Sequence, residues 1–170
     1  MGKLRESPSQ TAGPYVHIGC VPQTAGLERR GNGAQLGENP GEGVTLDITV
    51  LDGAGEPVRD ALIEIWQAGA GTDGWGRAAT DLETGVARFV TRKPEASERQ
   101  APHLLVWIAA RGINLALSTR VYFPDEDNEG DPVLQLAGAR ADTLMAARTN
   151  AGYAHVIRLQ GPEETVFFDV

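Results

Sequence analysis

The sequence predicts an all-β protein, a β-sandwich with one short helix and an extended N-terminal arm. Apolar and polar residues alternate in short runs, which is the pattern of strands that bury one face. Gly, Pro and Asp residues that favour turns separate about eight such runs, and a single stretch has helical spacing. A length of 170 residues fits one domain of this kind with a sizeable core.

The N-terminal part differs in composition from the rest, so we divide the chain into residues 1–43, an arm and a loop, and residues 44–170, the sandwich domain. Residues 7–21 contain Pro and Gly but also aromatic and aliphatic residues, so we expect this arm to pack on another surface. Residues 28–43 are rich in Gly, Asn and charged residues, which predicts a long loop.

The predicted strands begin at residue 44. Residues 44–50 alternate strictly between aliphatic and polar side chains, which indicates a half-buried strand. Residues 103–110 are apolar on both faces, as expected of a central strand, and residues 115–123 are expected to pair with them. The other predicted strands are residues 58–66, 86–91, 153–159 and 165–170, with a glycine-rich loop at 69–76 and a polar loop at 93–100.

One helix is predicted, at residues 141–148. Leu144, Met145 and Arg148 recur at helical spacing in this stretch. Asp142 would favour the first turn, because a carboxylate stabilises the N-terminus of a helix.

The charge and the cysteine content narrow the class of protein. A net charge of -8 and a pI near 4.8 argue against binding of nucleic acid or of an anionic membrane surface. The first residues lack the apolar core of a signal peptide, and no apolar run approaches the roughly 20 residues that span a bilayer. The single cysteine, Cys20, cannot form an intrachain disulfide. We therefore expect a cytoplasmic protein that contacts neither nucleic acid nor membrane.

Histidine and tyrosine side chains are the candidate metal ligands, since tyrosinate and imidazole suit Fe(III). Two tyrosine–histidine pairs are spaced by two residues: Tyr15 with His17, and Tyr153 with His155. Each pair could equally be two packing residues on one strand face. His103 begins an apolar strand, and the next residue on its face is Leu105 rather than a second histidine. These residues favour packing roles over a metal site.

Two further features have two interpretations each. Arg111 follows the apolar strand and precedes Gly112, so it is either a surface charge or a guanidinium that binds a carboxylate. In residues 11–15, Gly13 permits close backbone approach and Pro14 fixes the chain. This run is either a rigid arm against a ligand or a turn that anchors the N-terminus.

Several motifs occur in order along nearly the whole chain. The most specific are SQTAGPYVHIG at residues 9–19 and ARGIN at residues 110–114. Others are VRD at 58–60, EIWQA at 64–68, GR at 76–77, APH at 101–103, TRVYF at 119–123 and ETVFFD at 164–169. With these motifs the chain resembles the alpha chains of intradiol ring-cleavage dioxygenases that act on protocatechuate (3,4-dihydroxybenzoate).

The resemblance implies a non-haem Fe(III) enzyme of alpha and beta chains that share a β-sandwich fold. Such an enzyme cleaves protocatechuate with O2 to 3-carboxy-cis,cis-muconate, and two tyrosines and two histidines of its beta chain hold the iron. This chain has Leu105 in place of a second histidine, and no tyrosine in the loops at 69–76 and 95–100. His103 is then a lone remnant of the ligand strand, and we expect no metal site and no catalytic residue in this chain.

The resemblance also implies what the arm does. Residues 1–43 would pack on the beta chain, and four arm residues would line the substrate pocket that the two chains form: Thr11, Gly13, Pro14 and Tyr15. Arg111 would attract the carboxylate of the substrate. The loops at 69–76 and 95–100 are shorter than is usual for the family, so the rim of the pocket would differ.

Two other classes of function stay open. A non-enzymatic carrier module of the transthyretin-like sandwich type needs neither a metal nor a partner. A homomeric intradiol enzyme with an unorthodox site would hold iron when this chain is expressed alone.

Overall fold

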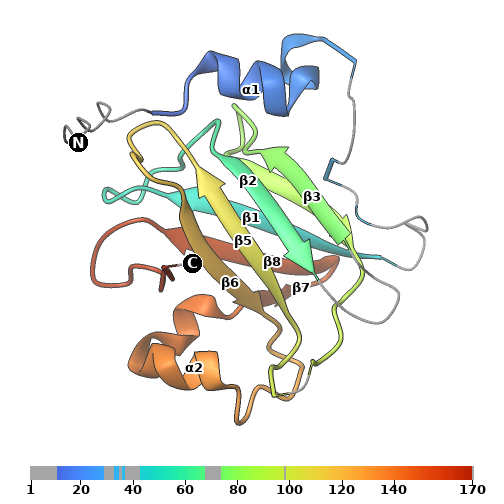
Figure 1. The fold of residues 1–170 in the computed structure, drawn as a ribbon, viewed down its shortest axis with the longest axis vertical. Coiled ribbons are helices and arrows are strands. Elements are labelled where there is room, and N and C mark those ends of the chain that lie inside the picture. The colour runs from blue at the N-terminus through green and yellow to red at the C-terminus, as the bar shows by residue number, and fades with distance from the viewer. Residues whose placement is uncertain are drawn as a thin grey trace, which may run out of the picture.

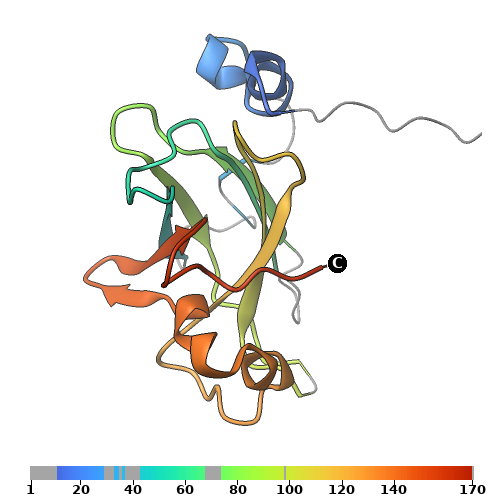
Figure 2. The same ribbon diagram turned by 90° about the vertical axis from the view of Figure 1, so that its left-hand side faces the viewer.

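The computed structural model describes residues 11–28, 33–34, 36, 43–67, 74–97 and 99–169. Within this part, two four-stranded sheets face one another, which Figure 1 shows from the front and Figure 2 from the side. The first sheet, in the order β4-β1-β8-β7, consists of β1 (Val44–Leu51), β4 (Val86–Thr91), β7 (Ala147–Thr149) and β8 (Gly152–Arg158). The second sheet, in the order β3-β2-β5-β6, consists of β2 (Leu62–Gln67), β3 (Gly74–Ala79), β5 (His103–Ala109) and β6 (Leu117–Tyr122).

The hydrophobic core lies between the two sheets and is built from alternate residues of the strands. On β1, Leu46, Ile48 and Val50 are fully buried, because successive side chains of a strand point to opposite faces. Leu104 and Ile108 of β5 belong to the same core cluster and contribute to it from the second sheet. The all-β sandwich that the alternating pattern predicts is therefore confirmed.

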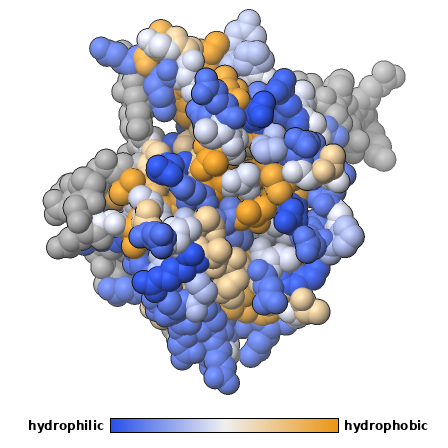
Figure 3. Space-filling view, turned by 180° about the vertical axis from the view of Figure 1, so that it is seen from behind, coloured by the Kyte–Doolittle hydropathy of each residue, from blue (hydrophilic) through white to orange (hydrophobic). Residues whose placement is uncertain are grey.

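The first sheet has a mixed pairing pattern. Strand β1 pairs antiparallel with β4 on one side and parallel with β8 on the other. On its outer face, Arg88 of β4 lies directly opposite Asp47 of β1 and donates two hydrogen bonds of 2.7 Å to its carboxylate. Figure 3, seen from behind, shows hydrophilic and hydrophobic residues intermixed on this side of the molecule. A cross-strand ion pair and apolar residues thus share this face.

The second sheet is antiparallel throughout. Trp66 of β2 is paired with Leu105 of β5, and Glu64 is paired with Trp107. Leu105 and Trp107 lie on the outer face and are 43% and 38% exposed. Strand β5 is central, as predicted for residues 103–110, yet only one of its two apolar faces is buried within the described part of this chain.

The described residues also contain four short helical segments. The α-helices are α1 (Pro14–Cys20) and α2 (Pro132–Ala137), and the 3-10 helices are η1 (Pro22–Ala25) and η3 (Gly138–Leu144). In this part of the chain, no helix is long and apolar enough to cross a membrane.

The prediction of a helix at residues 141–148 is wrong. That stretch contains the end of η3 and the start of the short strand β7. The α-helix lies earlier, because the Asp131 carboxylate accepts hydrogen bonds from the backbone N–H groups of Val133 and Leu134 at 2.8 and 3.1 Å. Pro132 suits the first helical position, where its missing N–H is not needed. Helical spacing of apolar residues alone did not locate this helix.

The predicted strand at residues 58–66 begins later than expected, at Leu62. Asp60 interrupts it, because its backbone has a φ of 67°, in the left-handed region that strands exclude. The predicted closing strand at residues 165–170 is not regular over its described residues, although the Thr165 N–H donates to the Arg158 carbonyl at 3.0 Å.

The predicted loops lie only partly within the described residues. The glycine-rich loop at 69–76 ends before Gly74, where β3 begins, and residues 69–73 are not described. Most of residues 28–43 and residue 98 also lie outside the described part.

Candidate functional site

Helix α1 carries the N-terminal arm across one end of the sandwich (Figures 1 and 2). Gly13 is its N-cap, and Pro14 occupies the first turn. The Val16 N–H donates to the Gly13 carbonyl at 3.0 Å. The Tyr15 residue is 88% exposed. Because this segment is helical, the alternative that Tyr15 and His17 share a strand face is wrong.

The arm is tied to the turn between β5 and β6. The backbone N–H of Gly112 donates a hydrogen bond of 2.9 Å to the Thr11 hydroxyl oxygen. Gly112 has a φ of 84°, a conformation that glycine adopts at little cost. Two of the segments singled out in the sequence, 101 positions apart, therefore meet at one place.

Arg111 lies beside this contact and is turned toward solvent. Its side chain is 67% exposed, and its Nε lies 3.0 Å from one carboxylate oxygen of Asp60. An open cavity of about 920 Å³ borders both residues and also Asn114. Among the described residues, the side-chain hydrogen bond of Arg111 uses Nε, and its terminal Nη atoms make no hydrogen bond. That edge of the guanidinium is free to bind a carboxylate in two-point fashion.

A second contact fixes the arm at Asp60. The ring Nε2 of His17 donates to the backbone carbonyl of Asp60. His17 thus has a structural hydrogen bond here rather than a role with Tyr15 as a metal ligand. Asp60 is a site residue that the sequence reasoning missed, and His17 was considered there only as a metal ligand. The VRD motif at 58–60 was the available signal, but nothing local to it indicates a contact with the arm.

The one histidine on the predicted ligand strand, His103, does not sit in a metal-binding arrangement. Its Nδ1 donates to the Ala101 carbonyl at 2.8 Å, and the next residue on its face is Leu105. Burial lowers the pKa of His103, the bond to Ala101 opposes this, and the nearby positive charge of Arg120 lowers it further. A fixed cation at this position would also repel Fe(III).

Tyr122, whose ring lies beside His103 with centroids 5.3 Å apart, does not complete a metal site either. Its hydroxyl donates to Asp131 at 3.2 Å and accepts from Arg120 at 3.2 Å. Burial, the main cause, raises its pKa to about 12, so the hydroxyl is protonated at physiological pH. The structure, in the part it describes, contains no cluster of three or more His, Cys, Asp or Glu able to hold a metal. These residues of the chain do not fit ferric iron.

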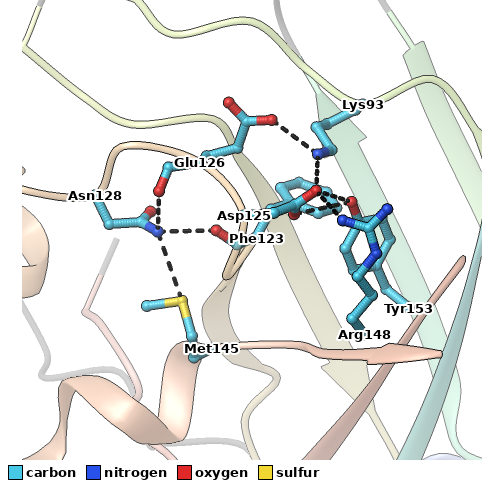
Figure 4. Close-up of polar contacts among 8 residues, drawn as sticks. All are labelled: Lys93, Phe123, Asp125, Glu126, Asn128, Met145, Arg148 and Tyr153. Atoms are coloured by element: carbon cyan, nitrogen blue, oxygen red, sulfur yellow. Dashed lines mark hydrogen bonds and ion pairs between the residues drawn. The ribbon is translucent and has the colours of Figure 1, made fainter.

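Tyr153 belongs to an ion-pair network at the end of the sandwich near β7, shown in Figure 4. Its hydroxyl donates to the Asp125 carboxylate at 2.9 Å, and Lys93 and Arg148 also bind this carboxylate, at 2.8 and 2.9 Å. Burial alone would lower the pKa of Lys93, but hydrogen bonds to Asp125 and Glu126 raise it. The tyrosine is therefore held by a salt-bridge network and is structural.

His155, the residue paired with Tyr153 in the sequence, lies on the same inward face of β8, as the strand-face interpretation predicted. Its ring is buried among the sheets, and neither ring nitrogen has a hydrogen-bond partner in the described part of the chain. Burial lowers its pKa to about 4. His155 is thus a neutral core residue at physiological pH.

A second hollow lies on the outer face of the second sheet. It encloses about 500 Å³, and its lining includes Trp66, Trp75, Leu105, Trp107 and Arg120. Trp75 is held in place, since its Nε1 donates to Glu64 and the Arg77 guanidinium lies 4.6 Å from its ring centroid.

Solved structures of intradiol dioxygenases share the fold of this chain. An intradiol ring-cleavage dioxygenase from Tetranychus urticae superposes with a TM-score of 0.59 and 13% identity, over 78% of this chain and 87% of that one. Catechol 1,2-dioxygenase from Pseudomonas arvilla C-1 superposes with a TM-score of 0.53 and 17% identity, over 89% and 72%. At these identities the likeness concerns the fold alone. No family model matches the chain.

Sequence comparison narrows the class. The chain is 40% identical to the protocatechuate 3,4-dioxygenase alpha chain of Pseudomonas putida, over 98% of this chain and 97% of that one. It is 37% identical to the alpha chain of Burkholderia cepacia over the full length of both. The chain therefore belongs to the family of protocatechuate 3,4-dioxygenase alpha chains, which confirms the resemblance seen in the motifs. The beta chain of Burkholderia cepacia is 32% identical over 69% of this chain and 57% of its own length.

Proposed function

We propose that this chain is the alpha subunit of a heteromeric intradiol dioxygenase that cleaves protocatechuate with O2 to 3-carboxy-cis,cis-muconate. The observation that carries the proposal is the near full-length match to alpha chains, at 40% identity over 98% of the chain. The local geometry is consistent with it, because the arm and the exposed Arg111 meet beside an open cavity.

We place the Fe(III) on a beta chain rather than on this one. Support comes from the ligand strand, where His103 is followed on its face by Leu105 and is accompanied by the cationic Arg120. The beta chain of Burkholderia cepacia shares sequence with this chain over a long segment, so a partner of the same sandwich type is expected. Catalytic residues are accordingly assigned to the partner and none to this chain.

The contribution of this chain is to bind and orient the substrate. Arg111 presents its free Nη edge to the substrate carboxylate, at the opposite end of the ring from the hydroxyl groups. None of the described arm residues lines the cavity beside Arg111 within this chain. In this proposal Gly13, Pro14 and the exposed Tyr15 instead face the beta chain and help to exclude water from the pocket that the two chains form. Holding the substrate at two ends fixes the geometry of reaction, which lowers the entropic part of the barrier.

The test is co-expression with a beta-type chain, followed by measurement of oxygen uptake with protocatechuate. We expect activity and iron only in the two-chain complex. The chain purified alone should have neither. If the solitary chain binds stoichiometric iron and turns over protocatechuate, the homomeric alternative is correct. If it binds an aromatic acid without any beta chain and the complex does not form, it is a carrier module.

A further inference from the structure

We propose that Asp60 is the positioning residue that aligns Arg111 and the N-terminal arm with each other. This inference rests on the proposed function of the arm and Arg111, and it adds a residue for which no role has been assigned. Asp60 makes two separate contacts, one through its carboxylate and one through its backbone carbonyl. Each contact orients a different part of the substrate-binding surface.

The carboxylate of Asp60 orients the guanidinium. One oxygen lies 3.0 Å and the other 3.4 Å from the Nε of Arg111. The Asp60 side chain is 23% exposed and the Arg111 side chain is 67% exposed. The carboxylate is therefore mostly shielded, while the guanidinium lies in solvent. A guanidinium anchored through Nε still presents two parallel N–H donors from its Nη atoms. The anchor therefore leaves the carboxylate-binding edge pointing outward.

The backbone of Asp60 orients the arm. Among the described residues, Asp60 is the one non-glycine residue with positive φ, at 67°. This conformation is uncommon for a residue with a side chain, although Asp tolerates it better than most. The Asp60 N–H donates to the Thr80 carbonyl at 3.2 Å, while its carbonyl accepts from His17. An unusual backbone conformation held by two hydrogen bonds is consistent with a positioning role.

Together these contacts join the arm, Asp60, Arg111 and Gly112 to one another. The arm is bound at Asp60 through His17 and at Gly112 through Thr11, and Arg111 is bound to Asp60 and precedes Gly112 in the chain. A shift of the arm at either point would move it relative to the guanidinium. Asp60 is the residue that contacts both the arm, through His17, and Arg111.

Three variants at residue 60 separate the two contacts. Asp60→Asn and Asp60→Gly remove the charge but keep a residue that accepts positive φ. Asp60→Val replaces it with a β-branched residue that does not adopt this conformation, so both contacts are lost. An ion pair this exposed adds little to stability, so the first two variants should fold normally. Asp142→Asn makes the same charge change at an exposed, distant position and is the matched control.

The measurement is steady-state oxygen uptake by the complex with a beta chain, using protocatechuate and catechol, which lacks the carboxylate. We expect Asp60→Asn and Asp60→Gly to raise KM for protocatechuate about tenfold with kcat within about twofold, because a ground-state contact is weakened. KM for catechol should stay at the wild-type value. In an Arg111→Ala background, the same substitutions should change nothing further, because the group that Asp60 orients is absent.

Hydrogen exchange tests the backbone contact. Amides of α1 should exchange as in the wild type in Asp60→Gly and faster in Asp60→Val. The inference is wrong if Asp60→Asn leaves KM unchanged while Arg111→Ala raises it, or if KM for catechol rises equally. It is also wrong if α1 exchanges alike in Asp60→Gly and Asp60→Val. Failure of the wild-type complex to consume oxygen would instead refute the proposed function.

Discussion

The stability of this domain should depend on pH through His155, a buried histidine that accepts no proton in the folded state near neutral pH. Its ring lies in the core on the inward face of β8, without a hydrogen-bond partner among the described residues. Burial, the largest cause, lowers its pKa from 6.5 to about 4. In the unfolded chain the ring regains the ordinary pKa near 6.5.

The sign and size of the effect follow from this difference. Above about pH 6.5 the histidine is neutral in both states and has no effect on the pH dependence. Between pH 6.5 and pH 4 the unfolded chain binds a proton that the folded chain does not, so stability falls as the pH falls. The gap between the two pKa values corresponds to roughly 3 kcal/mol, a large part of the stability of a typical domain.

Urea unfolding followed by tryptophan fluorescence, at pH values from 7.5 to about 4, measures this loss. Acid also protonates carboxylates such as Asp125 and Asp131, whose pKa values are lowered by hydrogen bonds in spite of burial. The His155→Leu variant shares that background, so the difference between the two proteins isolates the histidine. Equal pH dependence in wild type and His155→Leu, or a wild-type stability that does not fall below pH 6.5, would refute the reasoning.

Three further predictions concern other parts of the fold. In the two-chain complex, Arg111→Ala should raise KM for protocatechuate about 10- to 100-fold with little change in kcat; an unchanged KM with a large loss of kcat would contradict this. Asp131→Ala should lower the free energy of unfolding in urea by about 2–4 kcal/mol, because it removes the cap of α2 and leaves the buried Ala101 N–H without its acceptor. A loss below about 1 kcal/mol would contradict this. Gly112→Ala should lower the free energy of unfolding by about 1 kcal/mol and speed hydrogen exchange in α1, since Gly112 has a φ of 84°. Unchanged exchange would show that this turn does not stabilise the arm.

Much of the sandwich could be predicted because the sequence of a strand that buries one face shows a local alternation of side chains. Residues 44–50 alternate between aliphatic and polar side chains, and β1 occupies that stretch with its aliphatic residues buried. The helix prediction failed because only Leu144 of its three residues at helical spacing lies in a helical segment, η3, whereas Met145 follows that segment and Arg148 lies in β7. The better local signal was Asp131 followed by Pro132, a capping residue and a favoured first position.

The candidate site was only partly predictable, for a different reason. Arg111 could be singled out because it stands between an apolar strand and Gly112, which is local information. Asp60 could not, since its contacts with His17 and Arg111 join residues 43 and 51 positions away. Such pairings depend on how the sheets bring distant turns together, and a single sequence contains no record of them.

The parallel pairing of β1 with β8 has a consequence for biosynthesis. Thr45 is matched with Gly152 and Leu51 with Arg158, so this edge of β1 has its β8 neighbour only after the ribosome has also made residues 152–158. Contacts that span so much of the chain form slowly and leave strand edges open to aggregation meanwhile. A nascent chain that stalls before residue 152 would expose that edge, whereas the antiparallel hairpins of the second sheet could already have formed.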